Sequence, residues 1–169
     1  MLIITPLEDL DKVLDEHRGA HVCGLLSPDM DHPALDIPEE RRLKLSFHDL
    51  ARPRAGFIPA SENDVRALVD FAHAWRADGS GPLVIHCWAG ISRSPAAAFI
   101  VRCALEPRRD EMDLAHALRA LSPLATPNPL LVALADRMLG RNGRMIAAIA
   151  AMGRGQEAFL GKIFVWPES

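Results

Sequence analysis

The sequence predicts an α/β fold in which a mainly parallel central sheet carries helices on both faces. Short apolar runs alternate with helical patterns in the first half of the chain, and only helical patterns follow in the second half. Glycine and proline mark most of the junctions between them. The length of 169 residues suits one domain, which we place at residues 1–152, followed by a tail at residues 153–169.

The first predicted element is a strand at residues 2–4, a run of large apolar side chains. Thr5 and Glu8 then have the spacing of a capping box, so we expect a helix that starts there and ends at Gly19. The other strands are predicted at residues 22–26, 43–47 and 83–86.

Two proline-containing loops, at residues 27–40 and 51–59, connect these strands to the elements around them. A second capping box at residues 61–64 opens a helix. The apolar face of that helix is predicted to contain Val65, Leu68, Ala72 and Trp75. The helices of the second half are predicted at residues 94–106, 110–121, 128–139 and 144–152.

The composition is that of a globular protein from a reducing compartment. Hydrophobic residues make up 49% and charged residues 24% of the chain, and a net charge of -3 gives no general attraction to nucleic acid or to a membrane surface. The three cysteines form neither a Cys-x-x-Cys pair nor a dense framework. Residues 1–9 lack the regions of a secretory leader, and no later run reaches transmembrane length. We therefore expect a cytoplasmic protein that binds neither nucleic acid nor membranes.

The reactive chemistry is concentrated in one segment, which we call the Cys loop: His86-Cys87-Trp88-Ala89-Gly90-Ile91-Ser92-Arg93-Ser94. It lies between the predicted strand 83–86 and the predicted helix that follows. Ligands of parallel sheets bind outside the carboxyl ends of the strands, which is where Cys87 falls. A cysteine attacks as the thiolate, and a helix N-terminus and a nearby cation both favour that form.

The residue types of the Cys loop suit the binding of a tetrahedral dianion. Gly90 permits the backbone dihedrals with which successive amides can curl around phosphoryl oxygens, and Arg93 can close the ring as a bidentate fork. Ser94 can donate a hydrogen bond to the departing thiolate, and we expect His86 to orient the loop by hydrogen bonds. No second metal ligand stands at useful spacing from His86. The groups predicted to bind phosphate are the backbone amides of Trp88, Ala89, Gly90, Ile91 and Ser92 and the side chain of Arg93.

The pattern His86-Cys87-x-x-Gly90-x-x-Arg93-Ser94 resembles the active-site loop of the protein tyrosine phosphatase superfamily, and residues 89–94 are most similar to its dual-specificity branch. Residues 122–128 resemble the Pro-Asn segment that opens a late helix near the pocket in that branch, which makes Asn128 a supporting residue. The order of elements matches over roughly residues 1–140. The resemblance implies a cysteine-phosphatase-like fold with a helical C-terminal half, no metal and no organic cofactor.

Phosphoryl transfer to a thiolate also needs a carboxyl group that protonates the leaving oxygen and later activates water. Asp49 is the first choice because it follows the strand 43–47, opens a loop rich in Pro and Gly, and lies 38 residues before Cys87. The family that the Cys loop resembles places its acid upstream at a comparable, usually somewhat shorter, distance. Asp36 remains the main rival, because spacing alone does not decide between the two.

Residues and resemblance together predict a cysteine-dependent protein phosphatase that works through a phosphocysteine intermediate. Its substrate would be a phosphorylated protein or small phosphomonoester, with phosphotyrosine first and phosphoserine and phosphothreonine as further candidates. The chain contains no tyrosine, so the tyrosine-lined wall of the tyrosine-specific branch is absent and we expect a shallower pocket. A rhodanese-like sulfurtransferase and a non-catalytic phosphate-binding module are the alternatives. The role of the apolar tail and the oligomeric state stay open.

Overall fold

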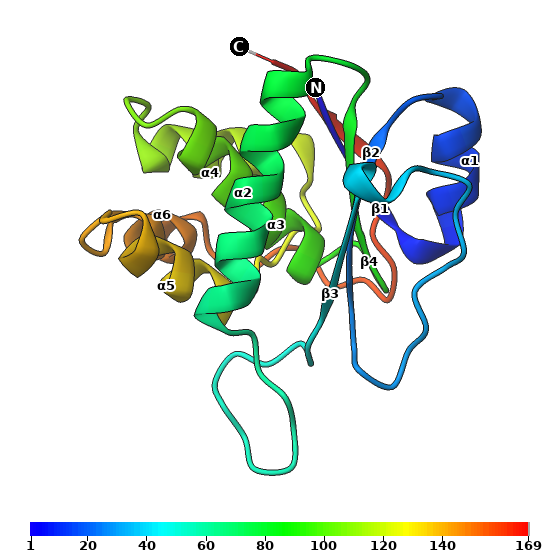
Figure 1. Ribbon diagram of the computed structural model, residues 1–169. Coiled ribbons are helices and arrows are strands. Elements are labelled where there is room, and N and C mark those ends of the chain that lie inside the picture. Colours follow the sequence, from blue (N-terminus) through cyan, green and yellow to red (C-terminus); the bar gives the residue numbers. More distant parts are fainter. Residues whose placement is uncertain (169) are drawn as a thin grey trace.

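A computed structural model gives the fold of the chain and describes residues 1–168 (Figure 1). Within these residues, five strands form one sheet in the order β3-β2-β4-β1-β5. The strands are β1 (Leu2–Pro6), β2 (His21–Leu26), β3 (Arg42–Ser46), β4 (Leu83–Cys87) and β5 (Phe164–Trp166). The first four strands run parallel to one another, and β5 pairs antiparallel with β1 at the sheet edge.

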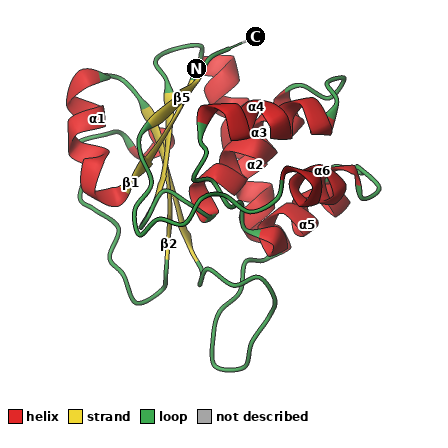
Figure 2. Ribbon diagram, turned by 180° about the vertical axis from the view of Figure 1, so that it is seen from behind, coloured by secondary structure: helices red, strands yellow, loops and turns green. Residues whose placement is uncertain are grey.

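Helices cover both faces of the sheet, so the predicted fold class is confirmed (Figure 2). The smaller layer is α1 (Leu10–Glu16), which packs with Ile3 and Val84 in one apolar cluster. The larger layer consists of α2 (Glu62–Asp78), α3 (Arg93–Leu105), α4 (Glu111–Leu121), α5 (Pro129–Met138) and α6 (Arg144–Met152). Ile4 and Ile85 point to this second layer, because neighbouring side chains of a strand face opposite sides. None of the helices within residues 1–168 combines the length and the hydropathy needed to cross a membrane.

The helix α3 lies at the centre of the larger layer, against α2, α4, α5 and β4. Every side chain from Arg93 to Cys103 is buried. The alanines of residues 96–98 leave room for close packing on several sides, and a helix surrounded in this way is apolar around most of its circumference. The N-terminus of α3 is therefore held in a fixed position beside the end of β4.

The helix starts show where local capping signals decide the structure. The predicted capping box of α2 is confirmed, because Ser61 Oγ accepts from the Asp64 N–H at 3.3 Å and the Asp64 carboxylate accepts from the Ser61 N–H at 2.8 Å. At α5, Asn128 Oδ1 accepts from the Leu131 N–H at 2.8 Å, and a proline occupies the first helical position.

The capping box predicted at Thr5 and Glu8 is wrong. Thr5 lies fully buried in β1, and its hydroxyl donates to the Pro6 carbonyl instead of capping a helix. Parallel pairing with β4 continues β1 as far as Pro6, and a short 3₁₀ turn at residues 7–9 then leads into α1. Sheet pairing here overrides the local sequence signal.

The tail contributes the strand β5, which the sequence analysis did not predict. Phe164 and Trp166 are buried and pair with β1, while the intervening Val165 is exposed. Beyond the strand, Glu168 accepts a hydrogen bond from the N-terminal ammonium at 2.7 Å. The tail thus packs on its own domain, and the two ends of the described chain lie close together.

Candidate active site

The Cys loop connects β4 to α3 at the carboxyl edge of the parallel strands. Cys87 is the last residue of β4, and Arg93 is the first residue of α3. The Cys87 side chain is buried, and its Sγ lies 3.2 Å from Ser94 Oγ and accepts a hydrogen bond from the Gly90 N–H at 3.2 Å. These two contacts hold the sulfur in place at the base of the loop.

Gly90 is required by both its conformation and its surroundings. Its φ is +70°, and a side-chain carbon placed on it would lie 2.8 Å from the backbone nitrogen of Pro6. The loop can therefore turn tightly against β1 only with glycine at this position.

The remaining backbone of the Cys loop is oriented by hydrogen bonds to its carbonyl groups. The donors and acceptors are Leu7 N–H to Trp88 O at 3.1 Å, Gly161 N–H to Ala89 O at 2.7 Å, Thr126 N–H to Ile91 O at 2.8 Å, and Asn128 N–H to Ser92 O at 3.2 Å. In a trans peptide the N–H points opposite to the C=O of the same unit. The amides that follow these carbonyls therefore point away from the surrounding segments, as the Gly90 N–H does when it meets Cys87 Sγ.

Arg93 is buried and held by the ends of two other strands. Its Nη1 donates to the Phe47 carbonyl at 3.0 Å and to Ser27 Oγ at 3.2 Å, and its Nε lies 3.8 Å from Asp49 Oδ2. These contacts fix the plane of the guanidinium beside the Cys loop, which is the preorganisation that bidentate oxyanion binding requires.

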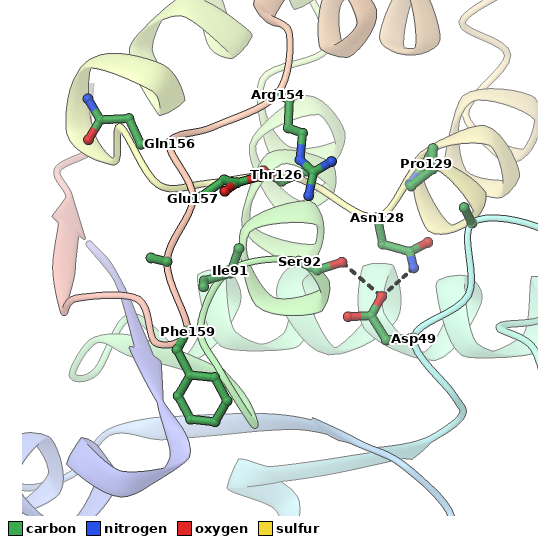
Figure 3. A pocket seen from close by; sticks show the side chains of 12 residues that line it. Asp49, Ile91, Ser92, Thr126, Asn128, Pro129, Arg154, Gln156, Glu157 and Phe159 are labelled. Carbon is green, nitrogen blue, oxygen red and sulfur yellow. Dashed lines mark hydrogen bonds between the residues drawn. The ribbon is translucent and has the colours of Figure 1, made fainter.

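Asp49 lies directly against the Cys loop. Its Oδ1 accepts from Ser92 Oγ at 2.8 Å and from Asn128 Nδ2 at 2.7 Å, as Figure 3 shows. The Asn128 amide group also donates to the Leu50 carbonyl at 3.1 Å, so a buried side chain that caps α5 aims the carboxylate. A carboxyl group held here can exchange a proton with a ligand bound in the loop.

The sequence profile of the protein-tyrosine phosphatase family matches residues 38–123. This range is just over half of the chain, and it includes Asp49 as well as the Cys loop. The chain belongs to the protein-tyrosine phosphatase family. It is a cysteine-based protein phosphatase, and the sulfurtransferase and the non-catalytic module that the sequence left open are not favoured.

Several solved structures share the fold of this phosphatase. DUSP15 is 19% identical with a TM-score of 0.64, covering 89% of this chain and 89% of that chain. Human DUSP28 is 16% identical with a TM-score of 0.60, covering 83% and 89%. The human tyrosine phosphatase-like serine/threonine/tyrosine-interacting protein is 17% identical with a TM-score of 0.65, covering 83% and 92%. No curated protein sequence matches the chain significantly.

The positions of Asp49 and Asp36 in the structure differ in a way that their spacing in the sequence does not reveal. Asp49 meets the Cys loop, whereas Asp36 lines a different cavity together with Gly19 and Ala20, at the amino end of β2. Parallel strands place their amino ends on the opposite edge of the sheet from their carboxyl ends. Asp36 therefore lies at the wrong edge to reach Cys87.

His86 is buried in the sheet and takes no part in the ion pairs of the site. Burial, and after it the charge of His32, lowers the pKa of His86 to about 4, so its ring is neutral at physiological pH. It packs against Gly24, where a side-chain carbon would lie 2.7 Å from His86 Nε2. The sequence predicts that His86 orients the loop by hydrogen bonds, but its buried Nδ1 has no hydrogen-bond partner among residues 1–168. The neutral ring has no imidazolium proton to donate at neutral pH.

Several residues of the phosphatase site were missed by the sequence analysis. Ser27 follows β2 and holds Arg93, although nothing in its local sequence marks it. Arg154 and Phe159 of the tail line an open cavity of about 770 Å³ beside the Cys loop. The other side chains of this cavity are Asp49, Ala51, Ile91, Ser92, Thr126, Asn128, Pro129, Gln156, Glu157 and Ala158.

Among residues 1–168, no group of three His, Cys, Asp or Glu side chains is placed to hold a metal ion.

Proposed function

We propose that this phosphatase hydrolyses phosphomonoesters in two steps, with Cys87 as the nucleophile, Arg93 and the loop amides as the phosphate-binding groups, and Asp49 as the acid and base. The observation that carries the proposal is the joint geometry of one buried sulfur, a loop whose carbonyls are tied outward, and a carboxylate bonded to the same loop. No metal or organic cofactor enters either step.

In the first step, Cys87 Sγ attacks phosphorus and the bond from phosphorus to the leaving oxygen breaks. The leaving oxygen takes the proton of the Asp49 carboxyl group, while Arg93 balances the charge on the non-bridging oxygens. In the second step, a water oxygen attacks phosphorus and gives its proton to the Asp49 carboxylate. The bond from sulfur to phosphorus breaks, and Ser94 stabilises the thiolate that leaves.

The substrate class that fits best is a phosphorylated protein. The cavity beside the Cys loop is open, and it offers room for residues that flank the phosphate. Phosphotyrosine is the first substrate, and phosphoserine and phosphothreonine are secondary ones. The net charge of -3 argues against nucleic acid and membrane surfaces as partners.

A reducing compartment such as the cytoplasm suits the cysteines. All three are free and buried. Burial raises the pKa of Cys103 to about 12 and raises that of Cys23 still further, so neither forms a thiolate at neutral pH. Cys87 is then the one reactive thiol that the cell must keep reduced.

The proposal is tested by phosphate release from phosphotyrosyl, phosphoseryl and phosphothreonyl peptides, phosphoinositides and an aryl phosphate. We expect the fastest turnover on phosphotyrosyl peptide and complete loss in Cys87→Ser. Activity of Cys87→Ser equal to that of the parent would remove the nucleophile from the proposal. Tight binding of the peptides without any turnover by the parent would favour the phosphate-binding module.

A further inference from the structure

The tail crosses the carboxyl edge of the sheet as a segment that we call the strap, residues 153–163. Its first half is fastened beside α5, where the Gly155 N–H donates to Thr126 Oγ1 at 3.0 Å and the Gln156 N–H donates to the Pro123 carbonyl at 3.0 Å. The strap is therefore tied to the same segment that carries Asn128.

The second half of the strap is fastened to the Cys loop itself. The Gly161 N–H donates to the Ala89 carbonyl at 2.7 Å, and the Phe159 ring packs edge-on against Trp88 with 5.3 Å between ring centroids. After this contact the chain enters β5, so the strap has a fixed point at each end.

Two glycines of the strap approach backbone so closely that no side chain fits. A side-chain carbon on Gly155 would lie 2.5 Å from the Leu124 carbonyl oxygen, and one on Gly161 would lie 2.8 Å from the Gly90 carbonyl oxygen. Close approach of this kind requires glycine. The strap is thus a fitted part of the structure and not a loosely attached tail.

The fixed strap forms one wall of the cavity whose opposite side holds Asp49 and Ser92. Figure 3 shows the Arg154 side chain extending from the strap into this cavity, toward the Ser92, Asp49 and Asn128 group. Arg154 is exposed and makes no hydrogen bond or ion pair with another residue of the described range 1–168. The neighbouring Arg119 differs, because its guanidinium donates to the carbonyls of residues 122, 123 and 153.

We propose that Arg154 selects substrates that carry a second anionic group next to the phosphate that is cleaved. This inference rests on the proposed function, because it takes the Cys loop as the site of that phosphate. A guanidinium at the side of the cleavage site, with its donors unused, can bind either a carboxylate or a second phosphate in a bidentate manner. Residues 1–152 would then carry the catalytic groups, and the tail would supply selectivity.

Two carboxylates share the cavity with Arg154 and define where the anion can sit. Asp49 is already compensated by Ser92, Asn128 and the nearby guanidinium of Arg93. Glu157 has no such partner among residues 1–168, so it repels an anion near the middle of the strap. The second anionic group is therefore expected at the Arg154 end of the cavity, between the strap and α5.

The test compares three phosphotyrosyl peptides of one sequence, in which the residue next to phosphotyrosine is Glu, phosphoserine or Gln. We expect the parent to favour each acidic peptide over the Gln peptide by roughly three- to fivefold in kcat/KM, with less preference at high salt. Arg154→Gln should remove this preference, and Arg154→Glu should reverse it. Comparing the two acidic peptides distinguishes a carboxylate from a phosphate as the preferred group.

The matched control is Arg108→Gln, which removes the same charge from the exposed loop after α3, at the far end of that helix from the Cys loop. It should keep the parent's preference, and Glu157→Gln should increase it. An acidic preference that survives Arg154→Gln, or no preference in the parent, would overturn the inference. Dissociation constants of the same peptides for Cys87→Ser should show the same ratios. This binding readout distinguishes failure of Arg154 selection from failure of the proposed chemistry.

Discussion

The Cys loop and the strap lie against each other, but they are held in opposite ways. Cys87 is 2% exposed and Arg93 5%, and both belong to the buried junction of β4 and α3. Phe159 of the strap is 77% exposed, and the strap is attached by a few hydrogen bonds and one ring contact. The groups that we propose to react thus sit in the core, where geometry is fixed, while the groups that we propose to face the rest of the substrate sit on a surface segment.

Asp49 is the exception to this difference between the Cys loop and the strap, because we propose it as the acid and base although its side chain is only partly buried. We expect Asp49→Asn to lower kcat on an alkyl phosphate by roughly 10²- to 10⁴-fold, with KM nearly unchanged, because the leaving oxygen loses its proton donor. An aryl phosphate should lose less, since its leaving group needs the proton less.

Asp36→Asn is the control for this prediction, because it makes the same chemical change at the far edge of the sheet. It should retain the parent rate on every substrate. A large loss of activity in Asp36→Asn together with an unchanged rate in Asp49→Asn would reverse the assignment.

The burial of the Cys loop also predicts a pH dependence of stability. The pKa of His86 is lowered from 6.5 to about 4, so between these values the unfolded chain binds a proton that the folded protein excludes. Stability should be complete above about pH 6.5 and fall as the pH drops toward 4, by about 3 kcal/mol from this residue. Denaturant unfolding at several pH values measures the loss. His86→Asn should be less stable at neutral pH but lose less over this range, and an equal loss in both proteins would exclude His86 as the cause.

A glycine-to-alanine substitution in the Cys loop and another in the strap compare the stability of these two regions directly. Gly90→Ala meets the Pro6 backbone and a positive φ inside the core, so we expect it to lower the free energy of unfolding by about 1–3 kcal/mol. Gly155→Ala meets the Leu124 carbonyl at the surface, where the clash should detach the first half of the strap and leave the core in place. Gly155→Ala should therefore change global stability less and speed proteolysis of the tail. Equal global destabilisation by both would mean that the strap belongs to the core.

The smallest expected effects on kcat come from two serines of the Cys loop, to which we assign different steps of the reaction. Ser92→Ala removes one of the two donors to Asp49 Oδ1, and Ser94→Ala removes the hydroxyl that lies 3.2 Å from Cys87 Sγ. We expect about a fivefold fall in kcat in each case, the size of one lost hydrogen bond. Pre-steady-state kinetics should show a product burst in Ser94→Ala, whose second step is slowed, and a smaller burst in Ser92→Ala. A larger burst in Ser92→Ala would contradict these assignments.

The sequence was sufficient wherever neighbouring residues determine the structure. The Cys loop is one such case, because Gly90 and Arg93 act within a few residues of Cys87, and the capping of α2 by Ser61 is another. The family resemblance added Asn128, whose contact with Asp49 spans 79 positions. Such a contact is not visible in spacing alone.

The sequence was not sufficient where distant segments meet. Ser27 reaches Arg93 across 66 positions, and nothing in its neighbours indicates this. The strap and β5 depend on pairing with β1 and the Cys loop, and a strand of three residues is too short for its hydrophobic period to be read. At Thr5 the local sequence misled the prediction: it has the spacing of a helix cap, but pairing with β4 keeps the residue in a strand.

The central claim is that Cys87 Sγ forms a bond to phosphorus, and trapping that bond tests it most directly. Asp49→Asn protein is mixed with phosphotyrosyl peptide, quenched rapidly, digested and analysed by mass spectrometry. The account predicts a phosphorylated peptide that contains Cys87, absent in Asp49→Asn combined with Cys87→Ser. Turnover of substrate by the parent, with phosphate bound to another residue or to none in the trapped protein, would contradict it.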